Sequence, residues 1–264
     1  MGVVERTPVF VHLLPSLAPP GILRGGVAVV TDVLRATTVM THALAAGVRC
    51  VIPTASIDEA RGAAMSFPPG TVILAGERQG LPIPGFDLGN SPGDFTPERC
   101  RGKTLVMTTT NGTLAILASL EADRVFIASF ANLAATARGV ALAIGQASSP
   151  PALHVVCAGT DGAVSLEDTL LAGALMEKVN RPEKNSGVDP ANDSALLAGA
   201  LWREAARNLD ARPLANVLGT GRGGRRVRQI GLEPDIAAAA VIDRFDLIAE
   251  TRLDPLRIEI RPGE

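Results

Sequence analysis

The sequence predicts an α/β protein with three layers, an αβα arrangement in which helices cover both faces of a mostly parallel sheet. Two observations support this fold class. Short runs rich in Val, Ile and Leu alternate along the chain with alanine-rich runs of helical periodicity. Several of the β-rich runs are apolar nearly throughout, as expected for strands that are covered on both faces. A mixed sheet with some antiparallel strands stays open.

The expected strands are short and are separated by the expected helices. Strands are predicted at residues 9–14, 27–31, 49–53, 71–75, 104–108, 124–128, 153–157 and 256–260. Helices are predicted at residues 37–46, 57–66, 112–120, 133–147, 166–178, 192–208 and 234–241. A polar break at 181–191 begins a helical excursion, at about 181–241, that returns to the last strand. We expect residues 1–264 to form a single domain.

Composition and charge argue against several classes of function. The net charge of −2 provides no basic surface for nucleic acid. No run of apolar residues is long enough to predict a membrane span, and the first residues lack a signal-peptide pattern. The spacing of Cys50, Cys100 and Cys157 is unsuited to disulfides or a thiolate zinc site, which fits a reducing cytoplasm. We expect no nucleic-acid or membrane partner, and a homodimer stays open.

Residues 76–92, GERQGLPIPGFDLGNSP, are predicted to form a long ordered loop that carries a site. Helices and strands do not tolerate this density of Gly and Pro. Apolar residues such as Phe86 argue against disorder. Glu77 and Arg78 place opposite charges in the loop, and structured loops often carry binding or catalytic residues. A packed Ω-loop with an internal Glu77–Arg78 pair is the structural alternative.

Asp32 directly follows the predicted strand at 27–31, and Arg35 and Thr37 lead into the next helix. Ligands of such folds bind beyond the carboxyl ends of the strands. A carboxylate there can hold a hard cation, and the N–H groups of a helix start can hold an anion. Asp32 could instead only cap the turn. A phosphoryl-aspartate mechanism of the haloacid-dehalogenase kind is disfavoured, because it requires an Asp at the position of Leu34.

The strand at 104–108 runs into TTTNGT, residues 108–113. The hydroxyl groups of Thr109, Thr110 and Thr113 and the amide of Asn111 suit a neutral cradle for phosphate or sulfonate. Helix capping explains the same residues equally simply. Ser129, at the end of the strand at 124–128, begins a weaker copy of this pattern.

Glu167 and Asp168 begin a helix after the strand at 153–157. Asp168 lies three residues after Ser165, so a structural role in helix capping is an alternative. Together with Asp32 and Glu77 these residues form a set of strand-end carboxylates without clustered His, which favours Mg²⁺ over Zn²⁺. Carboxylates for a metal beside arginines and threonines for an oxyanion indicate hydrolysis of a phosphate ester.

The segment GRGGRRVRQ, residues 221–229, carries four arginines without an aromatic residue. We expect a solvated or anion-facing loop rather than a nucleic-acid groove. Residues 219–224, GTGRGG, are similar to a nucleotide-binding loop only superficially. No strand clearly precedes them and no GK[ST] follows, so a surface turn is predicted.

Five of these motifs together resemble the 2-phosphosulfolactate phosphatase family. They are DVLRATT, GER-x-G-x-x-x-x-GFD-x-GNSP, TTTNGT, CAGT-x-G-x-x-SLED and GLEPDIAAA, in that order from about residue 27 to residue 245. The resemblance implies a Mg²⁺-dependent phosphomonoester hydrolase with its own αβα fold. It implies conversion of 2-phosphosulfolactate to sulfolactate in a route to coenzyme M. The segment 221–229 departs from the family pattern, since the family is usually less arginine-rich there.

The resemblance implies magnesium-side acids at Asp32, Glu77 and Glu167, and which of them touches the metal stays open. It also implies anion contacts at Arg35, Arg78, Thr109, Thr110 and Asn111. Two alternatives remain: a phosphatase for another phosphorylated or sulfonated small acid, and a non-catalytic anion-binding regulator on the same fold. With the residues singled out above, the candidate catalytic residues are Asp32, Glu77 and Glu167. The candidate metal ligands are these three residues and Asp168. The candidate substrate contacts are Arg35, Thr37, Arg78, Thr109, Thr110, Asn111, Thr113 and Ser129.

Overall fold

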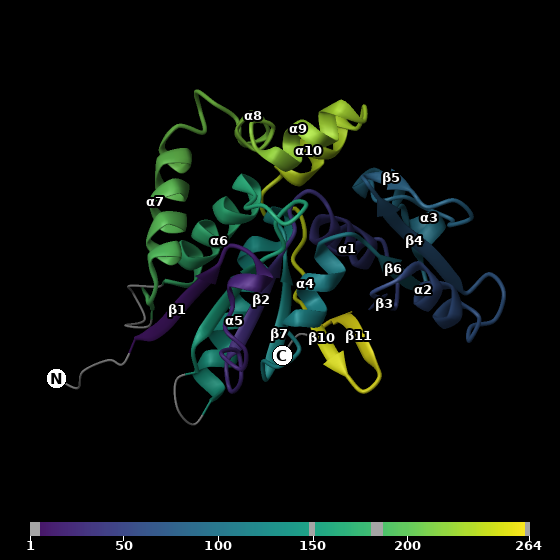
Figure 1. The fold of residues 1–264 in the computed structure, drawn as a ribbon, viewed down its shortest axis with the longest axis horizontal. Helices are drawn as coiled ribbons and strands as arrows, with labels where there is room; N and C mark the ends of the chain where they lie inside the picture. Colours follow the sequence, from purple (N-terminus) through teal and green to yellow (C-terminus); the bar gives the residue numbers. More distant parts are fainter. Residues whose placement is uncertain (1–5, 148–150, 181–186, 262–264) are drawn as a thin grey trace.

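A computed structural model describes residues 6–147, 151–180 and 187–261 (Figure 1). An 11-stranded, mostly parallel sheet runs through this part of the chain with helices around it, which confirms the predicted three-layer α/β class. No helix within these ranges is both long and apolar enough to cross a bilayer. The strands are β1 (Thr7–His12), β2 (Val27–Thr31), β3 (Cys50–Pro53), β4 (Val72–Arg78), β5 (Leu81–Pro82), β6 (Thr104–Thr108), β7 (Arg124–Ala128), β8 (Leu153–Cys157), β9 (Val188–Pro190), β10 (Ala249–Leu253) and β11 (Leu256–Ile260). The helices are α1 (Ala36–Ala45), α2 (Ile57–Ala64), α3 (Pro97–Cys100), α4 (Gly112–Ala118), α5 (Leu133–Gln146), α6 (Leu166–Val179), α7 (Asp193–Arg207), α8 (Leu214–Leu218), α9 (Arg222–Gln229) and α10 (Glu233–Ala239), with short 3₁₀ turns η1 (Pro15–Leu17), η2 (Pro92–Asp94) and η3 (Phe130–Asn132).

The sheet consists of two parallel groups joined by an antiparallel hairpin. The strand order is β5-β4-β6-β3-β11-β10-β7-β2-β8-β1-β9. Strands β4, β6 and β3 run parallel, as do β7, β2, β8, β1 and β9. The hairpin β10–β11 connects the groups, since β11 pairs with β3 through Ile258 and β10 pairs with β7 through Ala249 and Glu250. The sheet is therefore mixed, an option that the sequence left open.

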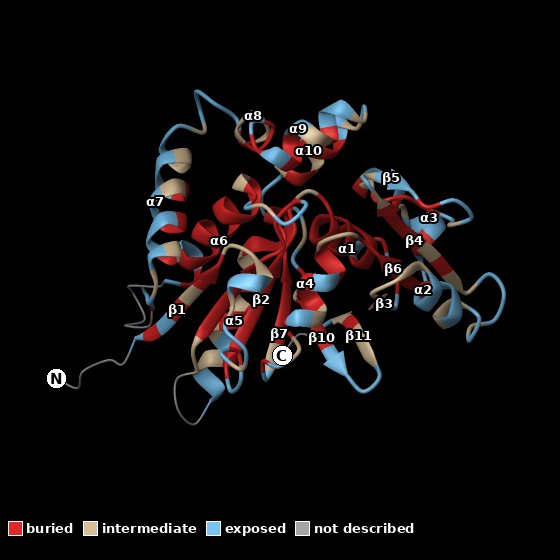
Figure 2. Cartoon of the chain, viewed as in Figure 1, coloured by how far each residue is buried: buried red, intermediate tan, exposed pale blue. Residues whose placement is uncertain are grey.

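Strand β2 shows how the sheet separates two apolar cores. All of its residues are buried. Val27 and Val29 join the core formed with α5, α6 and α7, whereas Ala28 and Val30 join the core formed with α1 and α4. Figure 2 shows the central strands buried along their length and exposed residues on the outer sides of the helices. This burial on both faces is what the continuous apolar runs predicted.

Helix α9 replaces the loop expected at 221–229. Gly223 and Gly224, which suggested a loop, are both buried in this helix. A Cβ atom on Gly224 would collide with the backbone of Leu218 and Gly219. The glycines therefore allow α9 to pack closely on the turn before it, and this contact overrides the low helix propensity of glycine. Residues 234–239 of the predicted helix 234–241 lie in α10.

The segment 76–92 begins as a hairpin and not as a loop. Gly76, Glu77 and Arg78 extend β4, and β5 pairs with its end in antiparallel register. A Cβ atom on Gly76 would collide with the carbonyl oxygen of Thr108 on the neighbouring strand β6. Glycine at this position thus allows two strands to approach closely, which composition alone does not reveal.

Several short elements were not predicted: β9, β10, α3 and α8. In β10 the charged residues Glu250 and Arg252 obscure a strand pattern. Glu250 is buried and forms an ion pair of 2.5 Å with Arg124 of β7. A strand that uses a buried charge in this way lacks the apolar alternation by which strands are recognised.

Two of the three histidines form a buried stacked pair at the β1–β8 junction. His12 Nε2 lies 3.1 Å from His154 Nδ1, and the ring centroids are 5.4 Å apart. His154 is also stacked on Phe10, and its Nε2 atom has no hydrogen-bond partner. Burial and the neighbouring His12 lower the pKa of His154 to about 4. The folded protein therefore holds this ring in its neutral form.

We predict that this pair makes the fold sensitive to acid. The pKa of His154 in the folded protein lies below its ordinary value of 6.5, so the unfolded chain takes up this proton at a higher pH than the folded chain does. The free energy of unfolding is therefore unaffected by this group above pH 6.5 and falls as the pH is lowered towards 4. At about 1.4 kcal/mol for each pKa unit, the loss is on the order of 3 kcal/mol. Urea unfolding at pH 7 and pH 4 should show a smaller pH difference for His154→Gln than for wild type. Equal pH differences would contradict the prediction.

Candidate active site

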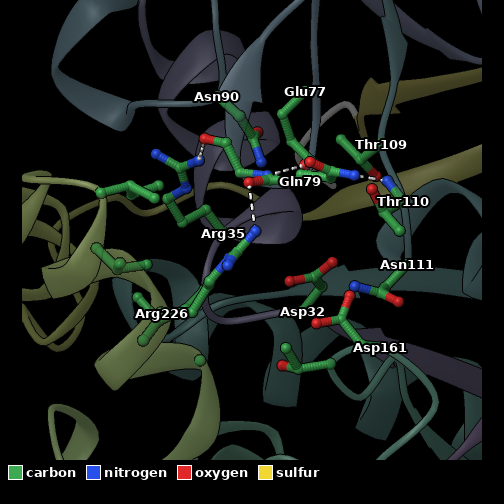
Figure 3. A pocket seen from close by; sticks show the side chains of 16 residues that line it. Asp32, Arg35, Glu77, Gln79, Asn90, Thr109, Thr110, Asn111, Asp161 and Arg226 are labelled. Atoms are coloured by element: carbon green, nitrogen blue, oxygen red, sulfur yellow. Dashed lines mark hydrogen bonds between the residues drawn. The ribbon is translucent and has the colours of Figure 1, made fainter.

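The polar strand ends meet in one pocket at the carboxyl ends of the strands, and α9 contributes part of its lining (Figure 3). Strands β2 and β8 contribute from one parallel group, and β4 and β6 contribute from the other. The pocket has a volume of about 50 Å³. It is lined by Asp32, Leu34, Arg35, Glu77, Gln79, Gly80, Asn90, Thr109, Thr110, Asn111, Thr160, Asp161, Gly223, Arg226, Val227 and Ile230.

Asp32 is positioned on the pocket wall by the turn between β2 and α1. Thr37 holds this turn: its Oγ1 accepts a hydrogen bond from Asp32 N–H at 3.0 Å and donates one to the Asp32 carbonyl at 2.9 Å. Thr37 is fully buried and does not line the pocket. Gly112 lies against the carboxylate, and a Cβ atom there would be 2.5 Å from Asp32 Oδ2. Glycine at 112 therefore leaves the space that the carboxylate occupies.

Asp32 is a carboxyl group poised to titrate near neutral pH. Burial raises its pKa to about 7, against the effect of the Ala36 N–H hydrogen bond. The negative charges of Glu77 and Glu167 raise it further, and the charge of Arg35 opposes them. A group with such a pKa can accept or donate a proton at physiological pH.

Glu167 and Asp168 lie behind the pocket, at the start of α6, and do not line it. Asp168 accepts hydrogen bonds from Val33 N–H at 2.8 Å and Gly159 N–H at 3.0 Å, and so ties together the ends of β2 and β8. Glu167 packs against Gly223 of α9, and its Oε2 atom is buried without a hydrogen-bond partner. Burial raises the pKa of both carboxyl groups. Both carboxyl groups are therefore harder to ionise than exposed ones.

Glu77 lines the pocket, whereas Arg78 does not. The Glu77 carboxylate accepts hydrogen bonds from Gly80 N–H and Thr110 N–H, both at 2.7 Å. It thereby joins the β4–β5 hairpin to the end of β6. The Arg78 guanidinium donates to the Glu77 carbonyl at 2.7 Å and to Thr108 Oγ1 at 3.0 Å. Arg78 thus connects the end of β4 to β6, and its side chain is not among the lining residues.

The TTTNGT segment divides between the pocket and a helix cap. Thr109, Thr110 and Asn111 line the pocket, but Thr113 does not. Thr109 and Thr113 cap each other, since each backbone N–H donates to the other hydroxyl oxygen, at 3.2 and 3.1 Å. The Thr110 N–H is used by Glu77, and the Thr110 Oγ1 atom is buried without a partner. The cradle predicted here therefore contains fewer available donors than the sequence implied.

Ser129 lies outside the pocket, at the start of η3. Its Oγ atom lies 3.1 Å from Thr41 Oγ1 and 2.9 Å from Asn132 Oδ1, and the single hydroxyl proton is shared between these two acceptors. Ser129 N–H also donates to Asn132 Oδ1, at 2.8 Å, which gives a reciprocal capping arrangement. The structure thus uses Ser129 to organise η3 and does not bring it to the other candidates.

Arg35 lines the pocket, but its charge is already balanced. Its Nη1 atom forms an ion pair of 2.7 Å with Asp235 of α10, and both side chains are almost completely buried. Its Nη2 atom donates to the Gly80 carbonyl at 2.7 Å. Ser91 Oγ donates to the same Asp235 oxygen at 2.9 Å. Arg35 therefore connects α1, the β4–β5 hairpin and α10.

Five lining residues with polar or charged side chains were not among the sequence candidates: Gln79, Asn90, Thr160, Asp161 and Arg226. Arg226 comes from the segment expected to be a loop. Residues 223, 226 and 227 of α9 and residue 230 directly after it follow helical spacing and together line the pocket. Recognising the helix would have revealed this face, because side chains three and four residues apart share one side of a helix.

The residues of the pocket fit Mg²⁺ only if water and substrate supply most of its ligands. In the parts of the chain that the structure covers, no three His, Cys, Asp or Glu side chains are grouped as a metal site. Mg²⁺ commonly takes one or two protein carboxylates and completes its shell with water and substrate phosphate. Asp32 and Glu77 in the pocket can supply these, and each Glu77 oxygen retains acceptor capacity beyond its one hydrogen bond. The unpartnered Glu167 Oε2 lies behind them.

Comparison with known proteins assigns the chain to the phosphoric monoester hydrolases. A family model described as 2-phosphosulpholactate phosphatase matches residues 12–253. The chain belongs to the 2-phosphosulfolactate phosphatase family, as the five sequence motifs indicated.

Relatives similar along most of their length carry the same name. A probable 2-phosphosulfolactate phosphatase of Symbiobacterium thermophilum is 38% identical over 234 residues, which covers 88% of this chain and 94% of that protein. Another, from Synechococcus sp. strain CC9605, is 38% identical over 237 residues, with 89% and 93% covered. A third, from Synechococcus sp. strain JA-3-3Ab, is 34% identical over 254 residues, with 96% and 95% covered.

We predict that the Arg35–Asp235 pair is required for the fold around the pocket. Asp235→Asn leaves a buried guanidinium without its counter-charge, which should lower the free energy of unfolding by about 3–5 kcal/mol. The exposed pair Arg207–Glu204 provides the control, because Glu204→Gln should cost less than about 1 kcal/mol. Chemical denaturation measures both. Equal small losses in the two variants would show that the buried pair contributes no more than an exposed one.

Proposed function

We propose that this protein hydrolyses a phosphate monoester of a small acidic metabolite, and that 2-phosphosulfolactate, yielding sulfolactate and phosphate, is the first substrate to test. Family membership and the names of the relatives support the reaction. A phosphatase for another phosphorylated or sulfonated small acid is the second candidate. The pocket supports either, since it is lined by acids, hydroxyls and amides together with arginine.

The observation that carries the proposal is the state of Asp32. Its carboxyl group lies on the pocket wall, and its pKa is raised to about 7 by burial and by the charges of Glu77 and Glu167. A structural cap is not expected to have a pKa near neutrality. A residue that accepts or donates a proton at physiological pH requires a pKa near neutrality. A non-catalytic anion-binding regulator would gain nothing from acids at this position, since they repel its ligand.

Asp32 would act on the attacking water. As a carboxylate it accepts the proton of a water molecule that attacks phosphorus, and the ester P–O bond breaks. The same proton can return to the leaving oxygen, so that an alcohol and inorganic phosphate are released. The Thr110 hydroxyl, which has no partner, is available to donate a hydrogen bond to a phosphoryl oxygen.

We infer that Mg²⁺ is the cofactor, held by Glu77 and by one oxygen of Asp32, which leaves the other Asp32 oxygen to face the attacking water, with the charge of Glu167 nearby. When bound, the ion would neutralise phosphoryl charge and lower the pKa of a bound water molecule. The acids of this site support the inference. Burial together with the charges of neighbouring carboxylates raises the pKa of Asp32 and Asp168, which is the situation that a divalent cation relieves.

We also propose a reducing compartment, the cytoplasm, as the location of the protein. Cys50, Cys100 and Cys157 are free thiols. Burial raises the pKa of Cys157, which keeps this thiol protonated and unreactive.

We predict that the protein releases phosphate from 2-phosphosulfolactate in a Mg²⁺-dependent manner. A panel of phosphorylated hydroxy acids, assayed for inorganic phosphate, tests the substrate class. EDTA should abolish turnover and excess Mg²⁺ should restore it, because the ion neutralises charge in the transition state. Full turnover in metal-free buffer would contradict the metal, and no release from any ester would contradict the hydrolase.

We predict that Asp32→Asn lowers kcat by at least about 100-fold, because an amide cannot act as a base and binds Mg²⁺ poorly. The second readout is the melting temperature with and without Mg²⁺. Wild type should be stabilised by the ion, and Asp32→Asn should show little of this shift. Asn is close in shape to Asp, so the variant should remain folded. Near wild-type kcat with a normal Mg²⁺ shift would reduce Asp32 to a structural residue.

A further inference from the structure

Arg226 is a cationic residue in the pocket, and no carboxylate of the described ranges forms an ion pair with it. Two arginines line the pocket, and Arg35 is paired with Asp235 at 2.7 Å. No ion pair involves Arg226 in the described residues. Its Nη2 atom donates one hydrogen bond, to the Gln79 carbonyl at 2.9 Å (Figure 3). A guanidinium carries five N–H donors, so most of those of Arg226 stay available to a ligand.

The charges of the pocket require such a residue if the ligand is an anion. Asp32, Glu77 and Asp161 line the pocket, and Arg35 adds little positive charge because of its partner. A metal ion can offset the acids where the phosphoryl group reacts. Among the described residues, a second acidic group on the same substrate would still meet one unbalanced cationic side chain in the lining, which is Arg226.

An unpartnered amide in the pocket also points to a ligand. Asn90 is 5% exposed and lines the pocket, and its Oδ1 atom has no hydrogen-bond partner in the part of the chain that the structure describes. Buried polar groups are normally hydrogen-bonded. The oxygen and nitrogen of an amide are assigned from such partners, so the Asn90 side chain can present N–H donors to an anion after a simple flip. Asn90 and Arg226 therefore offer a ligand donors that the folded chain leaves unused.

We propose that Arg226 binds a second acidic group of the substrate, a carboxylate or a sulfonate, and thereby selects phosphate esters that carry one. The proposal rests on the proposed function and assigns a residue within it. The guanidinium can form two parallel hydrogen bonds with either oxyanion. Since Arg226 acts on the part of the substrate that does not react, its loss should chiefly affect KM.

The first test measures binding without turnover. Isothermal titration with sulfolactate, lactate, isethionate and inorganic phosphate is compared for wild type, Arg226→Gln, Arg226→Lys and Arg222→Gln. Arg222 is the matched control, because it lies one turn earlier on α9, is exposed, and does not line the pocket. We expect Arg226→Gln to weaken sulfolactate binding 10- to 100-fold, with a smaller loss in Arg226→Lys. Arg222→Gln should change it less than twofold, and phosphate binding should be unchanged in all.

Lactate and isethionate show which acidic group Arg226 holds, since each carries one of the two. The group whose binding falls in Arg226→Gln is the one that contacts this residue. Sulfolactate binding that is unchanged in Arg226→Gln, or absent in wild type, would overturn the proposal. An equal loss of inorganic phosphate affinity would overturn it as well, because Arg226 would then contact the phosphoryl group.

The second test is kinetic and separates this proposal from the hydrolase itself. Arg226→Gln should lower kcat/KM for 2-phosphosulfolactate 10- to 100-fold, mainly through KM, and should change it less than twofold for p-nitrophenyl phosphate, which lacks a second acid. Equal losses for both esters would overturn the proposal. If wild type hydrolysed neither ester, the proposed function would fail, and the sulfolactate titration would still decide the role of Arg226.

Discussion

The pocket depends on the buried ion pair between Arg35 and Asp235. Arg35 directly precedes α1 and Asp235 lies in α10, and Arg35 also donates to the Gly80 carbonyl of the β4–β5 hairpin. Helix α9 directly precedes α10, so the pair helps to hold α9 over the strand ends. Removal of one charge from a buried pair is costly because the other stays desolvated. The same pair determines the chemistry, since it withdraws the charge of Arg35 from the pocket.

The pocket is left with more negative than positive charge. Asp32, Glu167 and Asp168 all have raised pKa values, with burial as the first cause. Such a site is satisfied either by protons or by a cation. A bound cation and an anionic ester would each reduce the electrostatic cost of the other. The affinity for substrate is therefore expected to depend on the ion, and the affinity for the ion on the substrate.

The sequence predicted most of the strand ends correctly, but it did not predict helix α9, which lines the pocket beside them. Strands β2, β6, β7 and β8 coincide with the predicted ranges, because continuous apolar runs report burial on both faces. Strand β11 also coincides with its predicted range, although its apolar residues alternate with Arg257 and Glu259. Asp32 and Glu77 were predicted to lie together, and both line the pocket. Arg226 was missed because Gly223 and Gly224 conceal a helix. The pairing of Arg35 with Asp235 joins residues 200 positions apart, which no local pattern can report.

The glycines of the motifs explain why the strand ends converge so tightly. Gly76 allows β4 to approach Thr108 of β6, and the next residue, Glu77, can then accept the N–H of Thr110. Gly112 leaves space for the Asp32 carboxylate, and Gly223 allows α9 to lie against Glu167. In each case backbone or carboxylate occupies the position of a missing Cβ. The glycine density that suggested loops instead permits close contact, and this contact desolvates the acids and raises the pKa of Asp32 and Glu167.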